Sequence, residues 1–402
     1  MTVRMKCLLA AVALAVGTAS LGGGTVALAE DGPIKIGFVT TLTTPAGVIG
    51  RDQVDALNLA LDHIGGKIAG HDVELVIEDD GLRPDLGRQK ADKLIKQDHV
   101  DVMAGFIWSN VLLAAQRPIF GAGKLLISTN AGPSELAGER CHENFFSTRA
   151  QNDMMPRALG KSMNQQGISK LYIMAPNYAA GQDMVRGVTD TFSGEVIGTD
   201  FTRWGADPQL DFSAELAKVG ASGAEALYVF YPGAAAGAFA KQFAQSGLAG
   251  QMALYSVYTI DQITLPVFQK ADVRAVLGTR LVDYWSPDLD NETNRRFVKA
   301  FQERYGRLPS NYAAASYDLL PYLKAAVEQS GGDIANTEAV RTALRNADYA
   351  SVRGTYAVGN NGYPIDRFYS LVTVEDEIWT TRTEGLATDG EADPYAADCP
   401  LP

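Results

Sequence analysis

Several short segments combine hydroxyl, amide and aromatic side chains directly after apolar runs of the sequence. In open parallel sheets, ligands bind beyond the carboxyl ends of the strands, where the loops lead into helices. Loops that share one sheet edge would together offer hydrogen-bonding groups and apolar walls to a small organic molecule. We therefore expect a ligand site formed by Thr43, Phe106, Trp108, Ser109, Asn110, Asn130, Ala131, Gly132, Tyr178, Tyr231, Gly233, Tyr258, Asp261 and Tyr284.

Ser109 and Asn110 stand where a helix is predicted to begin. The first turn of a helix has free backbone N–H groups and the positive end of the helix dipole, so it can hold a carboxylate without a cationic side chain. The alternative is that Ser109 or Asn110 caps its own helix, which is the commoner use of these residues. Both interpretations stay open, because several similar loops in one sheet favour a ligand contact as well.

Aromatic residues recur at the predicted strand ends. Any one of them taken alone fits ordinary packing. Six in corresponding places indicate a pocket with apolar walls and polar edges. They are Trp108, Tyr178, Tyr231, Tyr258, Tyr284 and Trp285.

Sequence motifs of enzymes are missing. The chain contains no G-x-S-x-G elbow, no phosphate-binding G-x-x-x-x-G-K-[ST] and no H-E-x-x-H. His63, His71, His99 and His142 are scattered, without the spacing of metal ligands. We expect no catalytic residue, cofactor or metal site.

The elements that would position these loops alternate along the chain. A helix is predicted from Asp52 onward by apolar residues at helical spacing. Alternating strands and helices predict an α/β protein with parallel sheets covered by helices, in two sets over roughly 33–150 and 151–280. Strands are predicted at 34–39, 73–78, 100–105, 125–128, 171–174, 196–197, 226–230 and 253–256, helices at 85–97, 291–305 and 312–329, and further strands within 354–374 around a turn at 360–362.

The N-terminus has the three parts of a secretory signal peptide. Arg4 and Lys6 precede an apolar stretch that is too short to span a membrane, and Ala27-Leu28-Ala29 supplies the cleavage pattern. Cys7 precedes that stretch, where it is badly placed for lipid attachment. The formal net charge of −12 argues against nucleic acid and anionic membranes as partners. We expect a free monomer in the periplasm of a Gram-negative cell.

Cys141 and Cys399 are the cysteines left after the predicted cleavage. An even pair in an exported protein favours a disulfide over two free thiols. Its expected role is to hold the acidic, Pro-rich C-terminal tail, whose composition otherwise indicates disorder.

Six short segments match one known family in order and spacing, over nearly the whole chain after the predicted signal peptide. They are IKIGF (34–38), EDD (78–80), LISTNA (126–131), DFS (211–213), QSGL (245–248), and YGRLPS with YAA (305–310 and 312–314). On these segments the sequence resembles the periplasmic leucine/isoleucine/valine-type solute receptors of ABC transporters.

The resemblance implies two Rossmann-like lobes joined by three hinge crossovers that close over a ligand. It also implies that permease subunits are partners, and that groups matching Ser109 and the 130–132 turn hold the ligand's carboxylate. The loops of Tyr178, Gly233 and Tyr258 would complete the pocket. The expected divisions are a signal peptide at 1–29, lobe 1 at 33–150 plus 283–352, lobe 2 at 151–282 plus 353–384, and a tail at 385–402.

Tyr258 departs from the pattern of the amino-acid-binding members, which place an acidic side chain there to meet the ligand's ammonium. A buried ammonium without a counter-charge is strongly unfavourable. The departure favours a carboxylate without an amine, such as a benzoate or cinnamate. A branched-chain or aromatic amino acid stays open if Asp261 or Asp283 reaches the site. A sensory receptor outside transport is a further alternative.

Overall fold

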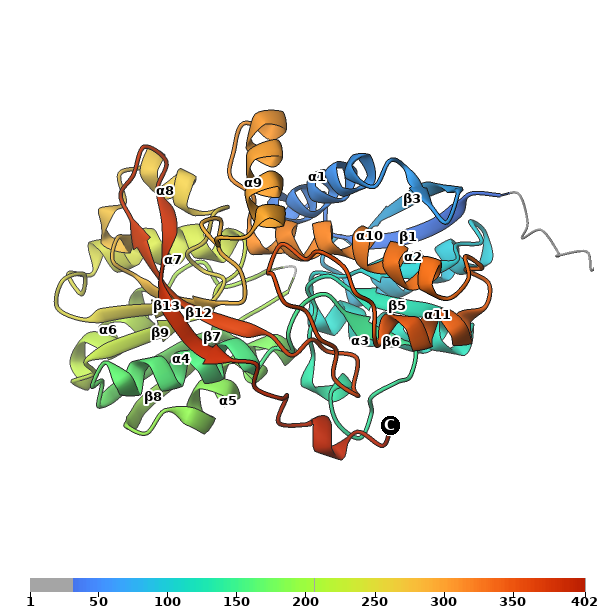
Figure 1. Ribbon diagram of the computed structural model, residues 1–402. Helices are drawn as coiled ribbons and strands as arrows, with labels where there is room; N and C mark the ends of the chain where they lie inside the picture. The colour runs from blue at the N-terminus through green and yellow to red at the C-terminus, as the bar shows by residue number, and fades with distance from the viewer. Residues whose placement is uncertain (1–31, 206, 402) are drawn as a thin grey trace, which may run out of the picture. The chain divides into compact units, whose positions relative to one another are not determined.

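The computed structural model describes residues 32–205 and 207–401. The predicted signal peptide and Cys7 lie outside the described residues. From Gly32 to Pro402 the chain forms one compact unit that contains two sheets, each flanked by helices (Figure 1). The predicted α/β class is confirmed.

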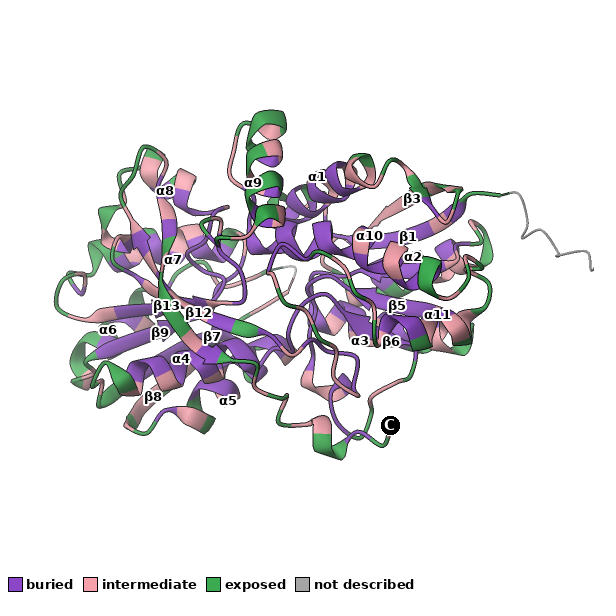
Figure 2. Ribbon diagram, in the orientation of Figure 1, coloured by how far each residue is buried: buried purple, intermediate pink, exposed green. Residues whose placement is uncertain are grey.

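The first sheet has the strand order β2-β3-β1-β4-β5-β6. Its ladders are parallel except for the short β2–β3 pair. The short strands β4 and β5 consist of apolar or small residues and are buried throughout, as expected of parallel strands covered on both faces (Figure 2). The strands are β1 (Ile34–Thr40), β2 (Lys67–Ile68), β3 (His71–Asp79), β4 (Val102–Gly105), β5 (Leu125–Ser128) and β6 (Phe145–Ser147).

The second sheet has the order β13-β12-β11-β10-β9-β7-β8. It is parallel from β8 to β11, and β12 and β13 add an antiparallel edge. The strands are β7 (Lys170–Pro176), β8 (Glu195–Thr202), β9 (Ala226–Val229), β10 (Ala253–Ser256), β11 (Arg280–Asp283), β12 (Arg367–Val374) and β13 (Thr380–Asp389).

Helices near the C-terminal end return to the first sheet. After β11 the chain forms α9 and α10, and α10 packs against α1 and α11 before β12 rejoins the second sheet (Figure 1). The helices are α1 (Gly47–His63), α2 (Pro84–Lys96), α3 (Ser109–Gly121), α4 (Met154–Gln165), α5 (Ala179–Thr191), α6 (Ser213–Ser222), α7 (Ala234–Gln245), α8 (Leu265–Lys270), α9 (Glu292–Tyr305), α10 (Asn311–Gln329) and α11 (Thr337–Leu344). None of the helices in the described ranges is long and apolar enough to cross a bilayer.

Helix α1 begins at Gly47, earlier than the predicted start at Asp52. The first turn contains Gly47 and Gly50, which disfavour a helix, so the apolar spacing did not mark it. Two polar residues further along the helix are buried. Asp52 accepts hydrogen bonds from Arg307 and Ser310, and Gln53 donates to Thr129. These distant partners satisfy the polar groups, so they can occupy the buried face.

The turn at Asn360–Gly362 is present, but the ladder predicted around it is not. Only a bridge between Val358 and Pro364 flanks the turn in this part of the described chain. Pro364 has no N–H to extend a ladder. The long antiparallel ladder lies further on, between β12 and β13, and β13 continues to Asp389, past the predicted start of the tail at 385.

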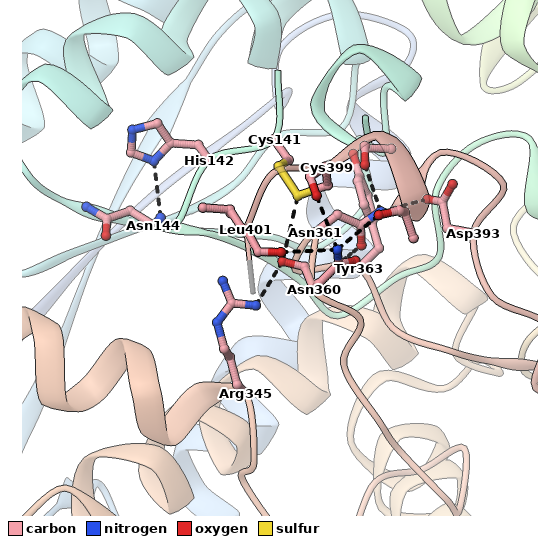
Figure 3. The surroundings of a disulfide bond; sticks show 12 residues. Cys141, His142, Asn144, Arg345, Asn360, Asn361, Tyr363, Asp393, Cys399 and Leu401 are labelled. Atoms are coloured by element: carbon pink, nitrogen blue, oxygen red, sulfur yellow. Dashed lines mark hydrogen bonds between the residues drawn. A yellow bond between two sulfur atoms is a disulfide. The ribbon is translucent and has the colours of Figure 1, made fainter. Parts of the chain in front are cut away.

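Cys141 and Cys399 form a disulfide, with their Cα atoms 5.7 Å apart (Figure 3). Around it, the Asn360 amide donates to the Ala396 carbonyl oxygen at 2.9 Å. The Tyr395 hydroxyl donates to Asp153 at 2.6 Å. We call the part of the unit around the first sheet its first half and the part around the second sheet its second half. The tail is thus bound through a covalent bond and through polar contacts to both halves.

Candidate ligand-binding site

A small polar and aromatic pocket, which we call the inner pocket, lies where loops from both sheets meet. Its volume is about 20 Å³, which is room for about one water molecule. It is lined by Ile107, Trp108, Ser109, Asn130, Arg149, Asn152, Tyr178, Ala180, Met184, Phe230, Pro232, Tyr258 and Tyr312.

The loop between β4 and α3 supplies one wall of the inner pocket. Phe106 has a left-handed backbone with φ of 62°, a strained conformation for a bulky residue. The bend is fixed because the Phe106 N–H donates to the Val39 carbonyl oxygen at 2.6 Å and the Ala131 N–H donates to the Phe106 carbonyl oxygen at 3.0 Å. Trp108 and Ser109 then line the pocket, and the Trp108 indole N–H donates to Thr41 at 2.8 Å.

Ser109 is the first residue of α3, and in the described chain no side chain caps this helix. The capping role considered for Ser109 is therefore not seen. Instead, the Asn152 amide donates to Ser109 Oγ at 3.0 Å and to Asp183 Oδ2 at 2.8 Å. The Ser134 hydroxyl donates to the other oxygen of Asp183 at 2.8 Å. These contacts join loops of the first sheet to the second half of the unit.

Arg149 is the cation of the inner pocket, and it is 2% exposed. Its Nη1 donates to the Asn130 carbonyl oxygen at 2.5 Å and to Asn152 Oδ1 at 3.3 Å. Over residues 32–205 and 207–401, no carboxylate lies within salt-bridge distance of this guanidinium, and its Nε has no hydrogen-bond partner. A buried charge of this kind is strongly unfavourable unless an anion joins it.

Aromatic rings form the opposite wall. Tyr258, with φ of 58°, presents its ring to Arg149 and donates from its hydroxyl to the Met155 sulfur at 3.0 Å. Its ring centre lies 5.3 Å from that of Tyr312 and 6.2 Å from that of Phe230. Burial raises the pKa of the Tyr258 hydroxyl well above its usual value. The wall is thus apolar in character and keeps its phenol neutral.

Trp204, on the loop after β8, packs on two residues of the inner pocket. Its indole stacks on Tyr178 with centroids 4.6 Å apart and an interplanar angle of 12°. It also lies 5.2 Å from the ring of Trp108. The indole Nε1 is buried and has no hydrogen-bond partner within the described part of the chain. Trp204 therefore covers one side of the aromatic wall.

Five of the fourteen candidate residues line the inner pocket: Trp108, Ser109, Asn130, Tyr178 and Tyr258. Phe106, Ala131 and Gly132 support it through their backbones. The Gly132 carbonyl accepts from the Asn152 N–H at 2.8 Å, and a Cβ at Gly132 would lie 2.8 Å from the Ala150 carbonyl oxygen. The remaining six do not line the pocket; they are Thr43, Asn110, Tyr231, Gly233, Asp261 and Tyr284.

Three of these six have roles elsewhere in the packing. The Tyr231 ring lies against Phe212 in the core of the second half, 4.7 Å between centroids. The Tyr284 hydroxyl donates to the Asn311 carbonyl oxygen at 2.7 Å. The exposed Thr43 donates to Asp79 at 2.5 Å.

Gly233 lies where the second half of the unit comes close to Ala46 of the first half. It has φ of 71°, and a Cβ there would lie 3.3 Å from the Ala46 side chain. Asn110 is half-buried on α3, behind Ser109 in sequence. The position of a residue after a strand therefore does not fix the direction of its side chain.

The two acidic residues considered as ammonium ligands are engaged elsewhere. Asp261 Oδ1 accepts from the N–H groups of Ile263 and Thr264, both at 2.9 Å. Asp283 accepts from the Asn311 amide at 2.5 Å. Burial raises the pKa of Asp261 to about 6 and that of Asp283 to about 7. Along the described residues, no Asp or Glu lines the inner pocket.

The other eight lining residues were not among the fourteen candidates; they are Ile107, Arg149, Asn152, Ala180, Met184, Phe230, Pro232 and Tyr312. Arg149 falls near the end of the predicted lobe 1 segment 33–150, and Tyr312 falls at the start of the predicted helix 312–329. A lone arginine after an apolar strand would have been the available signal, since β6 leads directly to it. Across the described residues, no group of three or more His, Cys, Asp or Glu side chains could hold a metal ion.

Comparison with known proteins gives one family and several relatives. The family model described as periplasmic binding protein matches residues 33–377. The Leu/Ile/Val-binding protein homolog 1 of Brucella abortus is 25% identical over 89% of this chain and 93% of its own length. The Leu/Ile/Val-binding protein homolog 3 of Brucella melitensis is 26% identical over 60% of this chain, and the match spans 64% of that relative.

A solved structure is also similar. It is an ABC-transporter solute-binding protein from R. palustris in complex with benzoate, 28% identical, with a TM-score of 0.85. The match covers 92% of this chain and all of that chain. The resemblance found in the sequence is confirmed, and the chain belongs to the periplasmic binding protein family.

Proposed function

We propose that this protein is the extracytoplasmic solute receptor of an ABC importer and that it binds a small aromatic carboxylate lacking an amine. The observation that carries the proposal is Arg149, a buried guanidinium that lines the inner pocket, has no described carboxylate within salt-bridge distance and leaves its Nε without a hydrogen-bond partner. A ligand carboxylate would supply the missing counter-charge through charge-assisted hydrogen bonds.

Other groups near Arg149 also favour a carboxylate at this end of the ligand. Ser109 opens the N-terminus of α3, whose dipole adds positive potential beside the guanidinium. Asn130 Oδ1 is buried and has no hydrogen-bond partner in the described chain, so it is available to a protonated or hydroxylated group on the ligand. A carboxylate held between Arg149 and Ser109 would direct the rest of the molecule toward the rings of Tyr178, Phe230 and Tyr258.

The aromatic part of the proposal rests on those rings and on the relative from R. palustris, which is described in complex with benzoate. Aromatic rings prefer offset-stacked or edge-to-face neighbours at centroid distances of about 4.5–7 Å. The pocket rings already adopt such distances among themselves. A flat ring inserted among them would keep the same geometry.

The second candidate is a branched-chain amino-acid receptor, which the names of the Brucella relatives favour. Its ammonium would need a carboxylate partner. Asp261 and Asp283 lie outside the lining, and their oxygens already accept hydrogen bonds. We therefore rank the amine-free acid first.

Calorimetric titration with matched ligands tests the choice. 3-Phenylpropanoate and L-phenylalanine share the ring and the carboxylate and differ by the amine. We expect benzoate or 3-phenylpropanoate to bind, and L-phenylalanine and leucine to bind at least tenfold more weakly. Benzamide, without the negative charge, should also bind weakly. Tight leucine binding with no response to the aromatic acids would overturn the proposal.

The location and the permease partners follow from the family and the predicted signal peptide, and they belong to the same proposal. The test is uptake of labelled benzoate by the source cells. Deletion of the gene should abolish high-affinity uptake, and the exported protein should be recovered in the periplasmic fraction. Retention in the cytoplasm would contradict the assignment.

A further inference from the structure

A second cavity, which we call the outer cavity, lies beside the inner pocket. Its volume is about 250 Å³, more than ten times that of the inner pocket. Residues of both halves of the unit contribute to it, with Ala46 and Leu82 from the first and Pro208 and Ala235 from the second. A space of this size accommodates a chain of several carbon atoms.

Two residues form the boundary between the inner pocket and the outer cavity. Pro232 lines both spaces. Trp204 lines the outer cavity while its indole stacks on Tyr178 and contacts Trp108, which line the inner pocket. The two spaces therefore share Pro232 in their walls, and elsewhere Trp204, packed on Tyr178 and Trp108, lies between them.

The outer cavity is apolar in chemistry. Alanine, leucine, proline and tryptophan side chains supply most of its wall. Among the described lining residues the cation is Arg83, which is bound to Asp85, with Nη2 2.6 Å from Oδ2. An apolar group placed there would gain from leaving water without facing an uncompensated charge.

The inner pocket alone has little room. A space of about 20 Å³ holds about one water molecule, and a benzene ring requires several times more. A ligand anchored at Arg149 must therefore displace the wall of the inner pocket that is least firmly held. Trp204 is only half-buried, and its Nε1 has no hydrogen-bond partner among the described residues. The wall between the inner pocket and the outer cavity, which contains Trp204, is therefore the one that we expect a ligand to displace.

We infer that the outer cavity is a second subsite, which receives an apolar substituent carried by the aromatic ring on the side away from the carboxylate. This rests on the proposed function, because it takes the carboxylate to be anchored at Arg149. The preferred ligands are elongated aromatic acids, such as benzoates with a para-alkyl chain. Trp204 and Pro232 set the width of the passage, and the outer cavity sets the length of the chain.

Calorimetric titration of the mature protein with benzoate, 4-ethylbenzoate and 4-butylbenzoate tests the inference. Burial of one methylene corresponds to about a fourfold gain in affinity. We expect 4-butylbenzoate to bind more than tenfold tighter than benzoate. Equal or weaker binding of the longer acids, with benzoate itself bound, would overturn the second subsite and leave the proposed function standing. No binding of any of the three would overturn both.

Two variants and a control sharpen the result. Ala234→Trp fills the outer cavity from the exposed first residue of α7, so the fold is not disturbed. It should lower the affinity for 4-butylbenzoate more than tenfold and change the affinity for benzoate by less than threefold. Lys241→Trp, on the exposed side of the same helix and outside the cavity lining, should change neither.

Trp204→Ala widens the passage and removes a stacking partner of Tyr178. We expect the affinity for benzoate to fall about tenfold, and the ratio of the affinity for 4-butylbenzoate to that for benzoate to rise. If Ala234→Trp weakened both ligands equally, the outer cavity would not be a distinct subsite, and the inference would be overturned.

Discussion

The guanidinium carbon of Arg149 lies 4.4 Å from the centre of the Tyr258 ring. A cation over an aromatic face is attracted by the ring, but the ring carries no net charge. Tyr258 therefore holds Arg149 in place and leaves its positive charge available. An acidic residue at position 258 would instead pair with the guanidinium and remove its affinity for an anion.

The Arg149–Tyr258 relationship predicts opposite outcomes for two substitutions at one position. Tyr258→Phe keeps the ring over Arg149 and loses only the hydroxyl contact with Met155, so benzoate affinity should stay within about threefold. Tyr258→Glu places a carboxylate beside Arg149 and should weaken benzoate by roughly 10- to 100-fold, since it competes for charge-assisted hydrogen bonds. Calorimetric titration measures both.

Circular dichroism and thermal melting serve as the fold control for these variants. If Tyr258→Glu remained folded and bound benzoate as tightly as the unchanged protein, Arg149 would not be the carboxylate anchor. A strong loss in Tyr258→Phe would instead indicate that the phenol itself contacts the ligand.

Two fully buried arginines should respond differently to replacement by methionine. Arg353 donates from Nη1 to both oxygens of Asp366, each at 2.9 Å. Removing it leaves a buried carboxylate without its cation, so Arg353→Met should lower the free energy of unfolding by about 3–5 kcal/mol. Arg149→Met removes a charge that has no described carboxylate within salt-bridge distance, so it should leave the stability of the ligand-free protein unchanged or higher.

Urea unfolding with and without benzoate distinguishes the two arginines. Arg149→Met should also lose the stabilisation that benzoate gives to the unchanged protein, because that gain requires binding to the native state. A large loss of stability in ligand-free Arg149→Met would show that the charge is satisfied inside the protein.

The elements of the fold were predictable where apolar patterns and strand lengths agree. β5 and β10 occur at the predicted residues, since each is a short apolar run with helices on both sides. The first turn of α1 was missed because Gly47 and Gly50 disfavour a helix. The burial of Asp52 was also not predictable from local patterns, because it depends on Arg307, which is remote in sequence.

The candidate site was predictable to the level of loops. Ser109, Asn130 and Tyr258, which were expected at strand ends, line the inner pocket. Arg149 was missed because its importance comes from what surrounds it, namely burial with no described carboxylate within salt-bridge distance. Tyr231 follows its strand in the expected way, yet its ring lies against Phe212. Side-chain direction after a strand depends on the twist of the loop, which composition does not encode.

Loss of the disulfide should destabilise the protein and release the tail. The double variant Cys141→Ser/Cys399→Ser removes a link between residues 258 positions apart. We expect the free energy of unfolding to fall by about 2–5 kcal/mol. Hydrogen exchange should increase over residues 391–401, where Asn360 binds the Ala396 carbonyl (Figure 3).

Tyr395→Phe is the control for the disulfide. It removes the hydrogen bond to Asp153 and keeps the disulfide, so the loss should be about 1 kcal/mol, with the tail still protected. Unchanged exchange in the cysteine double variant would mean that the hydrogen bonds alone hold the tail.

Asp261 makes the stability of the protein depend on pH. Burial raises the pKa of this carboxyl from 3.8 to about 6 in the folded state. The folded state therefore binds the proton more tightly than the unfolded chain, and stability is lost as the pH rises from about 4 to about 6. The loss is at most about 3 kcal/mol above that window. Asp261→Asn keeps the Oδ1 acceptor for Ile263 and Thr264 and cannot ionise.

Urea unfolding at pH 4 and pH 8 measures this effect. Asp261→Asn should match the unchanged protein at pH 4 and exceed it at pH 8, because only the unchanged protein must bury a charged carboxylate there. Asp272→Asn is the control, at an exposed residue with φ of 48°, which asparagine tolerates. Its free energy of unfolding should differ from that of the unchanged protein by the same amount at pH 4 and at pH 8. If Asp261→Asn were instead less stable at pH 8 than at pH 4 relative to the unchanged protein, the Asp261 carboxylate would be stabilised by its environment, and its negative charge would be available to a ligand ammonium. That outcome would move the amino-acid alternative ahead of the aromatic acid.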